Sequence, residues 1–144
     1  MNIYFACSIT GGRQDELVYQ KLVAALQEFG HHVPTALLAS PEVIPLEGVV
    51  IPEEVYARDV AWIAGCDFLL AEISTPSHGV GYEIGYALSH GKPVFCLHRQ
   101  GRKVSKMILG NPDPHLTVRT YGTPAQAVQL LNTYLENMPA MEAK

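Results

Sequence analysis

One stretch near the middle of the chain, residues 68–88, constrains the fold more than any other. It opens with the apolar run at residues 68–71, which is typical of a strand buried on both faces and therefore of a parallel sheet. Pro76 and Gly79 then break the chain. Apolar residues follow at the spacing of one helix face, at Val80, Ile84, Ala87 and Leu88. A strand, a polar turn and a helix in this order build a ligand site at the carboxyl end of a doubly wound sheet.

The rest of the chain repeats this alternation. We predict five strands, at residues 3–7, 32–34, 68–71, 93–97 and 116–120, and five helices, at residues 18–29, 52–64, 80–88, 104–109 and 124–138. This order indicates an α/β three-layer sandwich around a doubly wound, five-stranded parallel sheet of the flavodoxin or Rossmann type. Residues 1–138 are expected to form a single domain and residues 139–144 a frayed tail. Residues 37–52 lose the helical period, which favours a functional loop or lid.

The composition restricts the classes of function. The 144 residues are 48% hydrophobic and 17% charged, with a formal net charge of −4, which is ordinary for one globular domain. Scattered Lys and Arg do not make a surface for nucleic acid, and no apolar run approaches the roughly 20 residues of a membrane helix. The first residues lack a signal-peptide pattern. The separated cysteines Cys7, Cys66 and Cys96 favour reduced core thiols, so we expect a cytoplasmic protein.

The start of the helix after the central strand is a candidate anion site. Ser77 stands where a helix N-cap belongs, and the free N–H groups behind it favour an anion. Glu83 lies further along the same helix, so we expect a site for a phosphorylated small molecule. The turn at Gly11 and Gly12 resembles a phosphate loop only loosely, and tight-turn geometry explains it better than ligand contact. The six histidines show no metal-binding spacing.

Two carboxylates border the apolar stripes of neighbouring helices. Asp59 and Glu83 both lie at the edge of a face that packs on the sheet, where an unpaired charge is costly. They could form the carboxylate pair of a glycosidase, in which one attacks the anomeric carbon and the other handles the leaving group's proton. Alternatively, Asp59 could form a salt bridge with Arg13 or near Arg58. Tyr4 would by default be a core residue whose phenol needs a partner.

Three further polar residues have less specific interpretations. Glu72 ends the central strand and could face the cleft, or could only cap or pair with a basic residue. Asp67 precedes that strand and is most simply a turn residue. Ser105, in a basic-flanked run, is most simply a helix cap, with anion binding as the less favoured alternative.

Together these residues resemble the nucleoside 2-deoxyribosyltransferase superfamily, and most closely its branch of 2′-deoxynucleoside 5′-monophosphate N-glycosidases. The resemblance covers nearly the whole chain. Its most specific block is Ser-x-Gly-Val-Gly-Tyr-Glu at residues 77–83, and further matches begin at Tyr4, Asp59 and Cys96.

The resemblance implies a role for each matched residue. Glu83 would be the nucleophile that attacks C1′, Tyr4 would orient it, and Asp59 would help to protonate the departing base. Substrate and phosphate would be held by the remaining matched residues: Ser8, Ile9, Gly11, Gly12, Ser77, Gly79 and Ser105. Ser105 would reach the phosphate from the neighbouring subunit, which implies a homodimer with shared sites. No metal or organic cofactor is implied.

The function that follows is hydrolysis of a 2′-deoxynucleoside 5′-monophosphate to free base and 2-deoxyribose 5-phosphate through a glycosyl-enzyme. The alternatives are a deoxyribosyltransferase that exchanges bases, a ribonucleotide N-glycosidase of the CMP type, and a non-catalytic nucleotide-binding domain. Thr10 stands where mammalian relatives carry arginine, and residues 37–52, where base-facing groups are expected, align poorly. The base and sugar preferences are therefore open.

Overall fold

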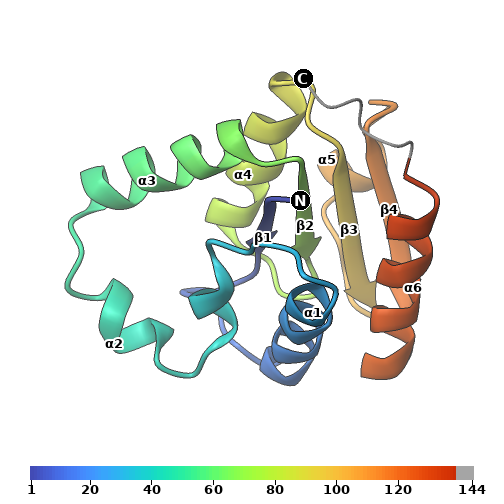
Figure 1. Cartoon of the computed structure of the whole chain (residues 1–144), viewed down its shortest axis with the longest axis horizontal. Helices are drawn as coiled ribbons and strands as arrows, with labels where there is room; N and C mark the ends of the chain where they lie inside the picture. Colours follow the sequence, from blue (N-terminus) through green and yellow to red (C-terminus); the bar gives the residue numbers. More distant parts are fainter. Residues whose placement is uncertain (139–144) are drawn as a thin grey trace.

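The computed structural model describes residues 1–138 and contains a parallel sheet of four strands. These are β1 (Ile3–Ala6), β2 (Phe68–Glu72), β3 (Val94–Arg99) and β4 (Leu116–Tyr121), which lie side by side in this order (Figure 1). All three pairings are parallel, so the carboxyl ends of the strands meet at one edge of the sheet. Both central strands are lined by buried apolar residues, as the continuous apolar runs predict.

The predicted strand at residues 32–34 is not a member of this sheet, so the five-stranded prediction is corrected to four strands and one bridge. His32 makes an isolated parallel bridge with Asn2, at the outer edge of β1. Pro34 follows two residues later and has no N–H to donate to a ladder, so the pairing cannot continue through it.

Helices cover both faces of the sheet, which confirms the α/β class. On one face lie α1 (Glu16–Glu28) and α6 (Pro124–Glu136), and on the other lie α3 (Pro52–Gly65), α4 (His78–Ser89) and the short α5 (Lys106–Leu109) (Figure 1). Side chains alternate along β2, so Phe68 and Leu70 join the core beside α1 and α6. Leu69 and Ala71 join the core beside α3 and α4.

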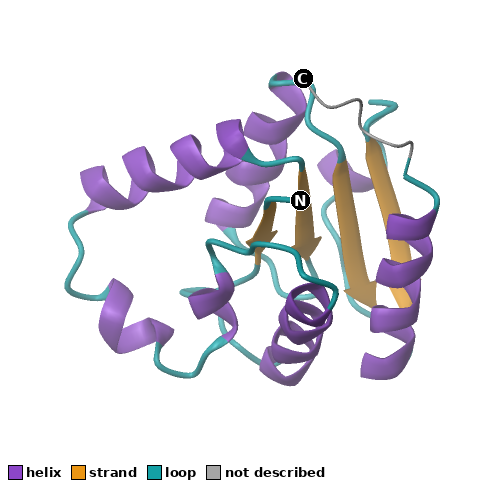
Figure 2. Ribbon diagram, in the orientation of Figure 1, coloured by secondary structure: helices purple, strands orange, loops and turns teal. Residues whose placement is uncertain are grey.

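The connection between α1 and α3 is not a plain loop. It contains a 3₁₀ helix, η1 (Ala36–Ala39), and a short α-helix, α2 (Val43–Glu47), beside the β1 edge of the sheet (Figure 2). Leu38, Ala39 and Val43 are buried and attach this segment to the core. Elements of four and five residues are too short to show a helical period, which explains why the sequence pattern missed them.

The predicted helix boundaries hold where capping residues mark them. Ser77 Oγ accepts a hydrogen bond from the N–H of Val80, and Pro52 and Pro124 stand in the first turns of α3 and α6. The three cysteines are free and buried. Within residues 1–138, no helix has the length and apolar character needed to cross a membrane. The predicted tail, 139–144, lies outside the described residues.

Candidate active site

A buried tyrosine and a half-buried glutamate form the centre of the candidate site. The Tyr4 hydroxyl donates a hydrogen bond of 2.7 Å to Oε1 of Glu83. Tyr4 lies in β1, fully buried, and alternation along the strand turns it towards α3 and α4. Glu83 lies in α4 beside the buried stripe of Val80 and Ile84, which brings its carboxylate over β1. The carboxylate of Glu83 is therefore the hydrogen-bond partner that the buried phenol of Tyr4 needs.

Asp59 reaches the same site from α3. Asp59 and Glu83 line one cavity of about 360 Å³, together with Gly79, Tyr82 and Val50. The carboxylate of Asp59 is held by an ion pair of 2.8 Å between its Oδ1 and Nε of Arg58. The salt bridge near Arg58, one of the two interpretations of Asp59, is present, and the same carboxylate shares a cavity with Glu83. Tyr4, Asp59 and Glu83 are thus brought together from three elements.

Burial dominates the electrostatics of the two carboxylates. Loss of solvent, and next the nearby charge of Asp59, raise the pKa of Glu83 to about 7, while the Tyr4 hydrogen bond and the Arg58 cation oppose the rise. Burial likewise raises the pKa of Asp59 against the ion pair with Arg58. Burial, followed by the two carboxylates, raises the pKa of the Tyr4 phenol, which keeps it a hydrogen-bond donor. Glu83 therefore exchanges its proton near neutral pH.

The amino end of α4 lies beside this cavity. Ser77 caps the helix, with its Oγ 3.4 Å from the N–H of Val80, and Gly79 lines the cavity itself. The first turn carries no acidic side chain, so the partial positive charge of the helix end is not cancelled there. This end of the helix has the polarity that an anion requires.

The turn at Gly11 and Gly12 packs against the loop that leads into α4. A Cβ added to Gly11 would lie 2.5 Å from the carbonyl oxygen of Pro76 and 2.9 Å from Oγ of Ser8, so only glycine fits there. Gly12 has φ +115°, in the left-handed region that favours glycine. Turn geometry alone therefore accounts for both glycines.

Ser8 and Ile9, at the end of β1, have different surroundings. Ser8 is fully buried, and its Oγ has no hydrogen-bond partner among residues 1–138. Ile9 is half-buried and packs against the core beside α1 and α6. An orphaned buried hydroxyl beside the Gly11 turn is a feature that a ligand or a water molecule could satisfy.

Ser105 caps α5, as predicted, and its Oγ accepts a hydrogen bond of 3.2 Å from the N–H of Met107. It lines a groove of about 380 Å³ between α4 and α5, together with Ser77 and Ile84. Within one chain, then, Ser105 and Ser77 share a groove, whereas Glu83 and Asp59 line the separate cavity described above.

Glu72 does not face the candidate cavity. It is fully buried on the α1 and α6 side of the sheet, where it accepts hydrogen bonds from the hydroxyls of Ser74 and Tyr121. The strand alternation explains the difference: Glu72 shares its face with Phe68 and Leu70, opposite to Tyr4. The expectation that Glu72 could face the cleft was therefore wrong. Asp67 accepts a hydrogen bond of 2.7 Å from the N–H of Asn2.

Sequence reasoning missed the contact between Arg58 and Glu47. Glu47, at the end of α2, forms two hydrogen bonds with Arg58, of 2.9 and 3.3 Å. Nothing in the sequence indicates this contact, because the two residues are separated by the break between α2 and α3. Among residues 1–138, no group of three or more His, Cys, Asp or Glu side chains is arranged to hold a metal ion.

Proteins from archaea and vertebrates are similar to this chain over most of its length. The chain is 43% identical over 120 residues to a protein of Methanosarcina mazei that carries the name 2′-deoxynucleoside 5′-phosphate N-hydrolase 1, covering 83% of this chain and 74% of the relative. It is 37% identical over 145 residues to the 5-hydroxymethyl-dUMP N-hydrolase of Danio rerio, covering 96% and 98%. The mouse protein with the latter name is 40% identical over 116 residues, covering 78% and 66%.

The fold and the family also match known proteins. The solved structure of a CMP N-glycosidase from Clostridium botulinum superimposes with a TM-score of 0.69 at 21% identity, covering 92% of this chain and 99% of the other. At that identity the match concerns the fold. The family model described as nucleoside 2-deoxyribosyltransferase matches residues 3–133, which include every residue of the candidate site. The chain therefore belongs to the nucleoside 2-deoxyribosyltransferase family.

Proposed function

We propose that this chain is a hydrolase that cleaves the N-glycosidic bond of 2′-deoxynucleoside 5′-monophosphates to free base and 2-deoxyribose 5-phosphate. The observation that carries the proposal is the Tyr4–Glu83 hydrogen bond beside the cavity that Glu83 and Asp59 line. Relatives at 37–43% identity carry the names of deoxynucleotide N-hydrolases, which supports the same substrate class.

The chemistry assigned to these residues has two steps. An oxygen of ionised Glu83 bonds to C1′ while the C1′–N bond breaks, and its electron pair leaves with the base, to which Asp59 helps to deliver a proton. Water then attacks C1′ while the glycosyl–Glu83 bond breaks, and the proton of the water goes to Asp59, which replaces the proton given to the base. Tyr4 orients the carboxylate, and the burial of Glu83 strengthens its attraction to the positive charge that develops on the sugar.

The 5′-phosphate is assigned to the amino end of α4. Ser77 and the N–H of Gly79 would contact the phosphate oxygens, supported by the end of the helix dipole. Ser8, Ile9, Gly11 and Gly12 would complete this side of the substrate site, next to the loop before α4. Binding the phosphate away from the reacting bond supplies energy to position C1′ against Glu83.

The active form is proposed to be a cytoplasmic homodimer in which Ser105 of one subunit reaches the phosphate of the other. The surface around α4 and α5 supports a second copy as the partner, because its apolar side chains are unusually exposed. Met107 is 83% exposed, Leu109 55% and Tyr82 54%. An exposed apolar surface of this kind is typical of a protein interface.

The test is chromatography of the products formed from dCMP, dGMP, 5-hydroxymethyl-dUMP, CMP, GMP and deoxyguanosine, each with and without free adenine. We expect base release from deoxynucleoside monophosphates at a rate that adenine does not change. Release of base from CMP alone would mean that the substrate is a ribonucleotide and not a deoxyribonucleotide. No release from any of these compounds would contradict the proposal and favour a non-catalytic nucleotide-binding domain.

A deoxyribosyltransferase is the second candidate, because the matching family model is described by that activity. The first step would be the same, and a second base would take the place of water at C1′. A new adenine deoxynucleoside or deoxynucleotide in the reactions with adenine would identify it.

A further inference from the structure

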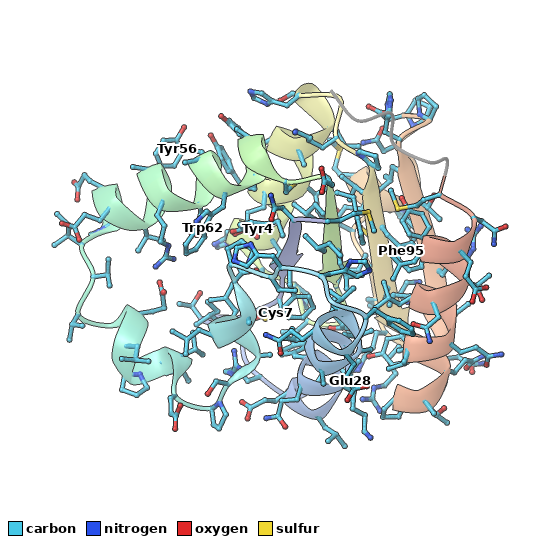
Figure 3. The ribbon with its side chains drawn as sticks, viewed as in Figure 1. Tyr4, Cys7, Glu28, Tyr56, Trp62 and Phe95 are labelled. Atoms are coloured by element: carbon cyan, nitrogen blue, oxygen red, sulfur yellow. The ribbon has the colours of Figure 1, made fainter. Side chains whose placement is uncertain are left out.

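The guanidinium of Arg58 is held on three sides. Its Nε donates to Oδ1 of Asp59 at 2.8 Å, and Nη1 and Nη2 bind the two carboxylate oxygens of Glu47 at 2.9 and 3.3 Å. Its carbon Cζ lies 5.0 Å from the centre of the Trp62 ring, within the range of a cation–π contact. Figure 3 shows Trp62 on the side of α3 that faces α2, opposite to Tyr56. The arginine is therefore fixed, and it joins α2 to the candidate site.

This arrangement needs a specific cause, because adjacent residues of a helix do not face each other. Arg58 and Asp59 are neighbours in α3, yet Nε of the arginine lies 2.8 Å from Oδ1 of the aspartate. Glu47 occupies the far end of the guanidinium and holds it in that position. The ion pair thus engages one oxygen of the Asp59 carboxylate, Oδ1.

We propose that Arg58 is a positioning residue, which fixes the carboxylate of Asp59 by one oxygen and balances the negative charge of Asp59 and Glu83 with its cation. The inference rests on the proposed function, because it assigns those two carboxylates to the reaction. Glu47 is the partner that holds Arg58 in place and sets how much of its charge the site receives.

The charges around the site give the direction of each effect. Asp59 is faced by Tyr4 from β1, Glu83 from α4, Glu47 from α2 and Arg58 from its own helix. Arg58 lowers the pKa of Asp59 and of Glu83, whereas Glu47 raises the pKa of Asp59. Removing the Arg58 cation and removing the Glu47 anion should therefore shift the pKa of Asp59 in opposite directions.

Three variants test the proposal in two measurements: the pH profile of kcat, and carboxyl NMR titration of the free protein. Arg58→Met should lower kcat about tenfold or more and move its acid limb upward by about one pH unit, since both carboxylates lose their cation. Glu47→Gln should lower the pKa of Asp59 in the NMR titration, because the Glu47 charge raises that pKa. Arg58→Lys should restore the limb but not the rate, because an ammonium keeps the charge without the planar fork.

Arg119→Met is the matched control. Arg119 lies on β4, at the opposite edge of the sheet. Within residues 1–138, its guanidinium donates one hydrogen bond, to the carbonyl of Val118. This variant should keep the wild-type profile. The proposal is overturned if Arg58→Met keeps the wild-type limb and a kcat within threefold, or if Arg58→Met and Glu47→Gln shift the pKa of Asp59 in the same direction. If Arg58→Met does not fold, the downward shift of the Asp59 pKa in Glu47→Gln decides, and its absence overturns the proposal.

The two proposals can fail separately. If the wild-type protein releases no base from any nucleotide, the proposed function fails, while the NMR titration still measures the opposite shifts of Asp59 in Arg58→Met and Glu47→Gln. If the wild-type protein is active, and Arg58→Met keeps the wild-type limb and a kcat within threefold, only the role of Arg58 fails.

Discussion

Two opposing influences meet at Glu83. Its burial favours the protonated form, and its hydrogen bond from Tyr4 favours the charged form that a nucleophile needs. The balance leaves the pKa at about 7, so the reactive form is lost as the pH falls through neutrality. In the proposed mechanism, the hydrogen bond from Tyr4 therefore sets what fraction of Glu83 is ionised at a given pH.

Replacing Tyr4 with Phe tests this balance. The variant loses the donor that lowers the pKa of Glu83, so the acid limb of kcat should move above pH 7 and kcat at pH 7 should fall about tenfold or more. Rate measurements from pH 5 to 9 would show it. The substrate phosphate titrates near pH 6 and is the same in both enzymes, so it does not contribute to the difference. An unchanged limb would mean that Tyr4 does not tune Glu83.

Residues of the site differ in how far the sequence could reveal them. Asp59 and Glu83 stand out because a carboxylate at the edge of an apolar helix face is costly to bury unless it is paired or solvated. Arg58 does not stand out, because its partners depend on how α2 folds back onto α3. That contact is tertiary, and no local pattern carries it.

At the scale of elements, the loop before α4 is held by contacts from both sides. The Gly11 turn touches Pro76, and Glu72 and the Arg99 N–H both bind the Ser74 hydroxyl. Thr75 Oγ1 lies 3.5 Å from a carboxylate oxygen of Asp15. The loop that presents Ser77 is therefore fixed by the ends of β1, β2 and β3.

Gly11→Ala should disturb this loop. The new Cβ would lie 2.5 Å from the Pro76 carbonyl oxygen, so backbone must shift, at a cost of about 1–3 kcal/mol in the free energy of unfolding. We also expect KM for a deoxynucleoside monophosphate to rise more than KM for the unphosphorylated nucleoside. Gly65→Ala in α3 is the control, since a Cβ there meets nothing within 4 Å. Equal changes in KM for both substrates would mean that the Gly11 turn does not contribute to phosphate binding.

Glu72→Gln tests the buried network on the other face of the sheet. Burial raises the pKa of Glu72 to about 7 in the folded state, from 4.5, so the wild-type protein takes up a proton on folding between these pH values and loses stability as the pH rises through them. Glutamine cannot ionise. Denaturant unfolding should show the variant gaining about 3 kcal/mol relative to wild type between pH 4 and pH 8. A difference that does not change with pH would contradict the burial of a titrating Glu72.

The helices and strands that could be predicted were the longer ones and those bounded by capping or chain-breaking residues. The central strand and α4 follow from an apolar run, a break and a helical stripe, and capping residues mark α3 and α6. The strand predicted at residues 32–34 is only a single bridge, because Pro34 has no N–H with which the pairing could continue. Two short helices within residues 36–47 failed because they contain about one turn each.

For the whole molecule, the central question is whether one site is built from two chains. The groove that holds Ser105 and the cavity that holds Glu83 are separate within one chain. The sequence suggests shared sites only through the family resemblance, because an interface between copies leaves no periodic pattern that differs from an ordinary apolar surface.

A mixing experiment answers this question. In a dimer with shared sites, combining Glu83→Gln with Ser105→Ala chains creates heterodimers in which one site has both native residues. An equal mixture, after subunit exchange, should therefore recover up to about a quarter of the wild-type rate at low substrate concentration. Ser105→Ala alone, at the same total concentration, is the reference. A mixture no faster than its separate parts, with heterodimers detected by native mass spectrometry, would contradict shared sites.

The most direct test of the account compares two glutamates in one assay. Glu83 and Glu72 both have a pKa raised to about 7 by burial, and both accept a tyrosine hydroxyl, but they lie on opposite faces of the sheet. We would measure base release from the preferred deoxynucleoside monophosphate for Glu83→Gln and Glu72→Gln, with the Tm of each. We predict a loss of at least about a thousandfold for Glu83→Gln and less than about tenfold for Glu72→Gln. A folded Glu83→Gln protein with a rate within tenfold of wild type would contradict it.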